Sequence, residues 1–256
     1  MARRFTSASS QYFASGSAPV TSLPVTLSAW YITDQVTAIG NLMYLTSTPG
    51  AGAVMLRFNG AASPDALQAA SYAGSGSHRV SSITNISASG VWGHACGVFA
   101  SSTSRIVYSN GSAGSEETTD NDASPQNWNA LYIGARYVSG TLSLYHTGVI
   151  AEPAIWSVAL TADEISLLAS GYSPLFVRPQ SLVFYAPLFG RAGASGDEED
   201  WSNGRTLVQT SSPAVADHPR IIYPRRRIIT PVGAAAPTTF IPSWARQNSR
   251  VIGGGV

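Results

Sequence analysis

Short runs in which every second residue is hydrophobic recur along most of this chain, and they constrain its fold more than any other feature. Such a period-two pattern is typical of strands with one buried face. Turn-forming residues separate the runs, as in Thr48–Gly52 and in the dipeptide Asn110-Gly111. The runs are Val25–Ile32, Asn41–Leu45, Ala53–Phe58, Val91–Phe99, Arg105–Ser109, Ala130–Ala135 and Leu142–Tyr145. Their spacing predicts an all-β sandwich or barrel.

One short helix interrupts this series. Thr161 and Glu164 have the spacing of a capping box, in which each side chain accepts from the other residue's backbone N–H. Leu160 and Ile165 stand at the positions of a hydrophobic staple, and Gly171 is a suitable stop. The pattern predicts a helix of about ten residues at the edge of the sandwich.

The pattern changes after two further strands, predicted at Ser181–Leu188 and Thr206–Gln209. From Pro213 onward a proline recurs every five to seven residues, which excludes a helix or a central strand. Apolar residues lie between the prolines, as they do not in a disordered linker. We therefore divide the chain into a sandwich at 1–212 and an extended arm at 213–256 that lies across a partner. The predicted partner-binding residues are Arg220, Ile221, Ile222, Tyr223, Arg225, Arg226, Arg227, Phe240, Trp244, Arg246 and Arg250.

Charge is sparse and unevenly distributed. Charged residues make up 11% of the chain, and all fifteen basic residues are arginines. Residues 1–217 hold nine arginines and fourteen acids, a net charge of −5, whereas residues 218–256 hold six arginines and no acid. This asymmetry is typical of an interacting tail. Six charges over 39 residues are a thin footprint for nucleic acid, so we expect an acidic protein surface as the partner.

Several functional classes find no support in the residue patterns. The single cysteine, Cys96, excludes an internal disulfide, and its apolar neighbours favour a buried thiol. The four histidines lack metal-ligand spacing, and neither a hydrolase triad motif nor a phosphate-binding loop occurs. No apolar run is long enough to span a membrane, and the N-terminus lacks an apolar signal core. We therefore expect a soluble protein made in a cytoplasm, without membrane association.

Two segments resemble laminin-G-like, concanavalin A-type lectin domains. Val91–Ala100 followed by Arg105–Gly111 resembles the central hairpin of this family, and Gly148–Ile165 resembles its closing strand and helix. Phe5–Trp30, and Leu182–Leu188 with Asp200–Gly204, are similar to other elements of the fold. The resemblance implies a concanavalin A-like jelly roll over roughly residues 5–210. The compact form with a proline-rich tail resembles structural proteins of tailed bacteriophages.

The resemblance raises three kinds of site. Glycosidases of this fold need two neighbouring carboxylates, but Glu152 stands alone, so we expect no enzyme. Relatives often bind calcium through loop carboxylates, and Asp120–Asp122 and Asp197–Asp200 are the candidates; the alternative is solvated acidic loops and no cofactor. Trp128, set among polar residues, is the candidate for an exposed glycan contact, whereas Trp30, Trp92 and Trp156 lie within strand patterns and are expected in the core.

These observations lead to two functional hypotheses. The first is a virion structural protein, a capsid decoration or cement protein assembled in the host cytoplasm and anchored by its C-terminal arm. Because the sandwich begins near Phe5, we expect the anchor at the C-terminus. Its partners are capsid or other virion proteins, and symmetric particle surfaces favour a homo-oligomer. The alternative is a phage tail or fibre lectin that binds host-surface glycan. A glycoside hydrolase or lyase is a disfavoured third.

Overall fold

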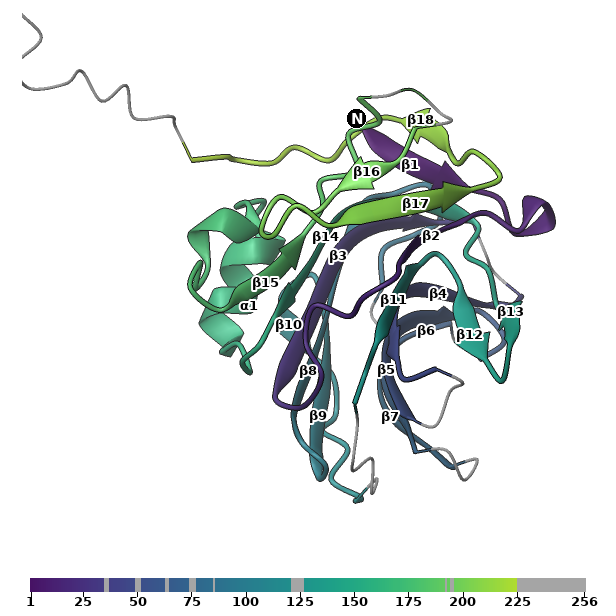
Figure 1. The fold of residues 1–256 in the computed structure, drawn as a ribbon. Helices are drawn as coiled ribbons and strands as arrows, with labels where there is room; N and C mark the ends of the chain where they lie inside the picture. The colour runs from purple at the N-terminus through teal and green to yellow at the C-terminus, as the bar shows by residue number, and fades with distance from the viewer. Residues whose placement is uncertain are drawn as a thin grey trace, which may run out of the picture. The chain divides into compact units, whose positions relative to one another are not determined.

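The computed structural model is a jelly-roll sandwich of two eight-stranded antiparallel sheets, which confirms the predicted fold class (Figure 1). It describes residues 1–224 except 35–36, 49–51, 63–64, 74–76, 85, 121–126, 192 and 194–195. Within that part of the chain, no helix is long and apolar enough to cross a membrane.

Sheet 1 is built around the long strands β3 and β14, which pair with each other along most of their length. Its strand order is β10-β9-β8-β3-β14-β1-β18, and β15 also pairs with β14. The strands are β1 (Ala2–Phe5), β3 (Val25–Thr33), β8 (Gly93–Ser101), β9 (Ser104–Ser109), β10 (Ser112–Ala113), β14 (Gly148–Trp156), β15 (Leu182–Tyr185) and β18 (Ala214–Ala216). The predicted β8–β9 hairpin is present.

Sheet 2 lies opposite, in the order β16-β17-β2-β11-β4-β5-β6-β7. Its strands are β2 (Tyr12–Ser15), β4 (Ile39–Thr46), β5 (Gly52–Asn59), β6 (Ala66–Ala73), β7 (Ser77–Ile83), β11 (Ala130–Ile133), β16 (Glu198–Glu199) and β17 (Thr206–Thr210). A separate hairpin, β12 (Arg136–Val138) and β13 (Thr141–Ser143), lies beside sheet 2 on the side away from sheet 1 (Figure 1). The sequence did not predict β6 and β7.

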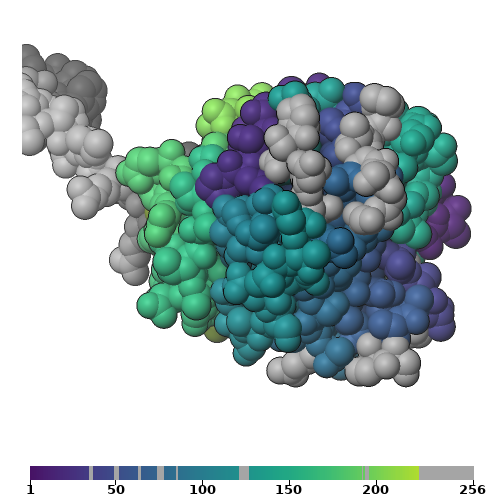
Figure 2. Space-filling model, turned by 90° about the horizontal axis from the view of Figure 1, so that it is seen from below, coloured from purple at the N-terminus to yellow at the C-terminus, as the bar shows by residue number. Residues whose placement is uncertain are grey.

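The main core fills the space between the two sheets. Alternate residues of each strand point into it, such as Leu27 and Ala29 of β3 and Val54 and Leu56 of β5, all fully or almost fully buried. The segment after β9 closes one edge of the sandwich, because Ser81 of β7 donates to the carbonyl of Ser115. In Figure 2 the teal surface of this segment adjoins the blue surface of the strands of sheet 2.

The helix α1 (Ala162–Ala169) covers part of the outer face of sheet 1. The short 3-10 helix η2 (Pro174–Phe176) packs beside it through Leu175, and a second one, η1 (Ser7–Ser9), follows β1. Ile165 and Leu168 of α1 are buried in a second apolar cluster with Trp156. The predicted capping box is present: the Thr161 N–H donates to Glu164 at 2.8 Å, and the Glu164 N–H donates back to the Thr161 hydroxyl.

The boundary predicted at residue 213 needs correction. Ala214–Ala216 forms β18, which pairs with β1 at the edge of sheet 1, where a neighbouring proline is tolerated. Further on, the Ile222 N–H donates to the Gly171 carbonyl at 2.7 Å. The chain up to Pro224 therefore forms one compact unit with the sandwich, and the remainder of the predicted arm, 225–256, lies outside the described residues.

Candidate functional site

The predicted partner-binding residues fall into two groups. Arg220 and Ile222 are exposed and Ile221 is partly exposed, whereas Tyr223 donates a 2.7 Å hydrogen bond to Glu152 of the same chain. Tyr223 is thus an anchor to the sandwich itself. The others lie outside the described residues: Arg225, Arg226, Arg227, Phe240, Trp244, Arg246 and Arg250.

The prediction that Trp128 is an exposed glycan contact is wrong. Its side chain is 1% exposed and belongs to the main core cluster between the sheets. The polar residues on either side of it, Asn127 and Asn129, suggest an exposed loop, but the indole turns inward and buries a large apolar area. Trp128 is a packing residue.

Two of the carboxylates proposed for calcium, Asp200 and Glu198, pair with arginines of the same chain. Asp200 accepts from the backbone N–H of Tyr185 at 3.0 Å and pairs with Arg205 at 2.9 Å. Glu198 pairs with the buried Arg3 at 2.6 Å. No group of three His, Cys, Asp or Glu gathers among the described residues. Of the other cluster, Asp120 is described, whereas 121–122 lie outside the described part.

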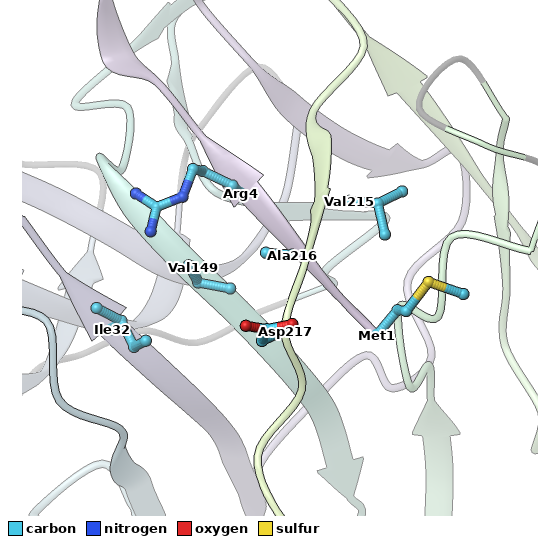
Figure 3. Close-up of a pocket in the computed structure, with 7 residues that line it drawn as sticks. All are labelled: Met1, Arg4, Ile32, Val149, Val215, Ala216 and Asp217. Atoms are coloured by element: carbon cyan, nitrogen blue, oxygen red, sulfur yellow. The ribbon is translucent and has the colours of Figure 1, made fainter.

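A groove of about 480 Å³ lies on the outer face of sheet 1, where β1, β3, β14 and β18 are neighbours (Figure 3). Apolar side chains of Ile32 and Val149 form part of its lining, with Arg4 and Asp217 as its charged groups. Arg4 already pairs with Asp34 at 2.7 Å. The groove therefore offers little unpaired polarity for specific recognition.

The outer face of sheet 2 is different, because polar and aromatic side chains follow one another across its strands. Tyr132, Tyr44 and Met55 are directly opposite one another on β11, β4 and β5. One row along, Arg57 faces Gln68, and on the other side Tyr72 faces His78. Cross-strand neighbours such as these lie about 5 Å apart at their Cβ atoms, so they form one continuous surface.

Tyrosine rings cover one part of this face. Tyr132 is stacked on Tyr137 of the β12–β13 hairpin, with ring centroids 5.4 Å apart and planes 8° from parallel. Tyr12 lies 6.2 Å from Tyr132 and 6.4 Å from Tyr145. All four rings are partly exposed. Rigid rings with polar tips provide contact area at a low entropic cost, as they do in many binding surfaces.

Next to the rings, several buried polar atoms have no hydrogen-bond partner. They include the Tyr44 hydroxyl, His78 Nδ1 and Arg136 Nε. Burial raises the pKa of Tyr44 to about 12, against smaller lowering contributions from the Thr46 hydroxyl and the Arg136 charge, so the phenol stays protonated. Burial, with the charges of Arg57 and Arg136, lowers the pKa of His78. Unsatisfied buried donors are rare in folded proteins and call for an explanation.

The strands that form this face carry no acid. Apart from β16 at the far edge, the strands of sheet 2 and the β12–β13 hairpin contain neither Asp nor Glu. Their basic residues on the outer face are Arg57, His78 and Arg136. The charged side chains that these strands place on the face are therefore basic, although residues 1–217 as a whole carry a net negative charge.

The sequence from residue 7 to residue 166 matches the profile of the Laminin_G_3 family, described as the concanavalin A-like lectin/glucanases superfamily. This match spans more than half of the chain. The protein belongs to this superfamily. No curated protein sequence matches the chain.

Solved structures share the fold of this concanavalin A-like protein at low sequence identity. A putative carbohydrate-binding protein from Bacteroides ovatus has a TM-score of 0.56 and 20% identity, over 82% of this chain and 57% of that one. The CBM40 of Ruminococcus gnavus IT-sialidase, bound to α2,3-sialyllactose, has a TM-score of 0.52 and 12% identity, over 66% and 96%. The enzymatically active domain of tailspike protein 2 from bacteriophage CBA120 has a TM-score of 0.51 and 14% identity, over 73% of this chain and 31% of that one. Such likeness establishes the fold.

Sequence reasoning missed the polar residues of this concanavalin A-like sandwich that now form the candidate site. Arg57 is the one charged residue of β5, and a charge inside a largely apolar strand was the signal available. His78 lies on β7, which has no clear apolar alternation. Arg136 reaches the site from a hairpin outside the sheet, and no local pattern indicates that position.

Proposed function

We propose that this protein is a non-catalytic carbohydrate-binding module whose ligand binds the outer face of sheet 2. The observation that carries the proposal is the combination of partly exposed tyrosine rings with buried polar atoms that lack partners in the protein. Sugar rings have apolar faces that pack on aromatic rings, and hydroxyls that pair with fixed polar groups. A binding site with few well-placed polar groups among aromatic side chains has this composition.

The absence of acids from the strands of this face favours binding over hydrolysis. Most glycosidases use two carboxyl groups that flank the scissile bond, about 5–10 Å apart. Glu152, the acid of β14, belongs to sheet 1, and both of its oxygens accept hydrogen bonds from tyrosine hydroxyls. A ligand on sheet 2 is therefore bound without a carboxylate pair from the strands beneath it.

A glycan array tests this proposal with the full-length protein. We expect binding that weakens at least tenfold in Tyr137→Ala, because this variant removes one ring of the stacked pair while leaving the sheet intact. Trp201→Ala is the matched control, since Trp201 is an exposed aromatic residue on a different part of the surface. Equal binding by Tyr137→Ala and the parent would contradict the proposal, as would an array without any bound glycan.

A second candidate function concerns the assembly to which the protein is attached. The net charge of +6 in residues 218–256, against −5 in the rest, and the spaced apolar residues support a virion structural protein anchored by its C-terminal segment. In this proposal the chain decorates a bacteriophage capsid or another virion surface. The fold shared with a tailspike domain is compatible with it.

Truncation after Pro224 tests the anchor, because the compact unit ends there. We expect the truncated chain to unfold at the same temperature as the parent and to stop co-sedimenting with virions from an infected culture. The control is Arg4→Gln in the full chain, which changes charge on the sandwich alone. Co-sedimentation of the truncated chain at the parental level would exclude a C-terminal anchor.

A further inference from the structure

Arg57 and Arg136 lie close together on the outer face of sheet 2. Arg57 projects from the middle of β5 and is 8% exposed, and Arg136 begins the β12 strand of the hairpin beside it. Burial, followed by the charge of Arg136, lowers the pKa of Arg57 to about 10. That value is still well above neutrality, so Arg57 is charged at pH 7.

In the described part of the chain, no ion pair joins a carboxylate to Arg57 or Arg136. Among the described residues, four other arginines pair with an acid within 2.9 Å or less, and they are Arg3, Arg4, Arg178 and Arg205. Arg57 instead donates from Nε to the Gln68 amide oxygen at 2.9 Å and from Nη1 toward the sulfur of Met55. A buried cation beside a second cation is costly unless an anion accompanies it.

The neighbouring polar atoms are also suited to an anion. The Tyr44 hydroxyl is buried and stays protonated, with the Thr46 hydroxyl as its neighbour in the protein, so it keeps a proton that it can donate. Arg136 Nε is a buried donor without a hydrogen-bond partner, and His78 Nδ1 is another buried polar atom that lacks one. Convergent donors without acceptors match a group with several acceptor oxygens, and guanidinium groups bind carboxylates and sulfates in a forked geometry.

We propose that the ligand of this face is an acidic glycan whose carboxylate or sulfate group binds between Arg57 and Arg136, next to the Tyr44 hydroxyl. This inference rests on the carbohydrate-binding function proposed above and narrows its ligand class. The acidic group enters the arginine site, and the sugar rings extend over Tyr132 and Tyr137. Tyr72 and His78, whose rings are 5.0 Å apart, border the site on its other side.

The experiment compares acidic and neutral sugars on the same protein. Sialylated, uronic acid-containing and sulfated glycans are presented on one array with their neutral counterparts, and affinities of the best pair are measured by calorimetry. We expect at least a tenfold preference for the acidic member, which decreases with added salt. Sodium sulfate is the control for a simple anion and should bind far more weakly.

Variants assign this preference to the two arginines. Arg136 is partly exposed, so we expect Arg136→Gln to fold as the parent does. In this variant the acidic glycan should bind no better than its neutral counterpart. Arg57→Gln should do the same, and Arg57→Lys should recover part of the preference because it restores the charge without the fork. Arg4→Gln, on the outer face of sheet 1, should behave as the parent.

The possible failures are distinct. Glycan binding with no acidic preference, or a preference unchanged in Arg136→Gln, would overturn the acidic-ligand assignment and leave the carbohydrate-binding function standing. Binding of sulfate as tight as that of the acidic glycan would also overturn it, because the sugar would then contribute nothing. The absence of all glycan binding would remove both proposals together.

Discussion

Glu152 and Arg57 are buried charged residues on the outer faces of the two sheets, but their surroundings differ. Glu152 accepts hydrogen bonds from the hydroxyls of Tyr185 at 2.6 Å and Tyr223 at 2.7 Å, and His218 Nε2 lies 3.1 Å away. Arg57 has an amide, a thioether and a second guanidinium for neighbours. The protein supplies hydrogen-bond donors to both oxygens of Glu152, whereas no carboxylate among the described residues forms an ion pair with Arg57.

The difference separates a structural role from a binding role. Burial, together with the adjacent Glu152 carboxylate, raises the pKa of both Tyr185 and Tyr223, so both hydroxyls remain donors. Glu152 thereby joins β14 to β15 and to the segment that ends at Pro224. A buried polar group whose partners are complete stabilises the fold, whereas one whose partners are missing calls for an explanation, and on the outer face of sheet 2 the proposed ligand provides it.

The largest expected effect is the loss of stability in Glu152→Ala. The variant leaves two buried tyrosine hydroxyls without an acceptor, and we expect the free energy of unfolding to fall by about 4 kcal/mol. Urea unfolding measures this change. Trypsin should also cut faster at Arg220, because Tyr223 no longer holds that segment to the sandwich.

Glu199→Ala is the matched control for this variant, since Glu199 is an exposed acid. It should change stability by less than about 0.5 kcal/mol. If the two variants unfolded at the same urea concentration, Glu152 would not be the structural link that its hydrogen bonds indicate.

A smaller effect on stability, with a large effect on binding, is expected for Arg57→Met. An apolar side chain of similar length removes a buried charge that lacks a carboxylate partner, at the cost of one hydrogen bond to Gln68. The two effects offset each other, so the free energy of unfolding should stay within about 1 kcal/mol of the parent. Binding of the acidic glycan should weaken at least tenfold.

Arg3→Met provides the contrast, because Arg3 is also buried but pairs with Glu198 and donates to two backbone carbonyls. We expect it to lose about 3 kcal/mol of stability. Urea unfolding of both variants gives the comparison. A loss in Arg57→Met as large as that in Arg3→Met would make Arg57 a structural residue and weaken the case for a binding site.

The sequence was most informative where the signal is local. The capping box at Thr161, the β8–β9 hairpin and the turn at Asn110-Gly111 depend on residues a few positions apart. In that turn both residues have a positive φ, 49° and 84°, as the dipeptide predicts. Alternation also located most strands of the main core, because one buried face per strand is enough to produce it.

The candidate site was not predictable for the opposite reason. β6 and β7 mix small residues such as Ala69 and Ser81 with larger ones on their inner face and carry polar residues such as Gln68 and His78 on their outer face, so alternation is weak there. The bond between Tyr223 and Glu152 joins residues 71 positions apart. Trp128 is buried by contacts that its polar neighbours in sequence do not reveal. Long-range packing decides each of these cases.

The smallest expected effect is a pH dependence of glycan binding through His78. Its pKa lies below the ordinary value because of burial, Arg57 and Arg136, so the ring is neutral at pH 7. A bound acidic group offsets the two arginine charges and raises this pKa, and by linkage the complex takes up protons more readily than the free protein. Affinity should therefore increase roughly threefold from pH 7 to pH 5.5.

The stability of the free protein changes with pH in the opposite direction to the affinity, because it decreases on acidification. A histidine with a lowered pKa in the folded state is protonated first in the unfolded chain, so acidification below about pH 6.5 destabilises the fold. Calorimetric titration at the two pH values, with His78→Gln as the control, separates the two effects. Since Gln cannot titrate, that variant should lose the pH dependence of binding and retain the acidic preference. A parent whose affinity falls on acidification would show that His78 does not face the bound anion, and would confine the site to the two arginines and Tyr44.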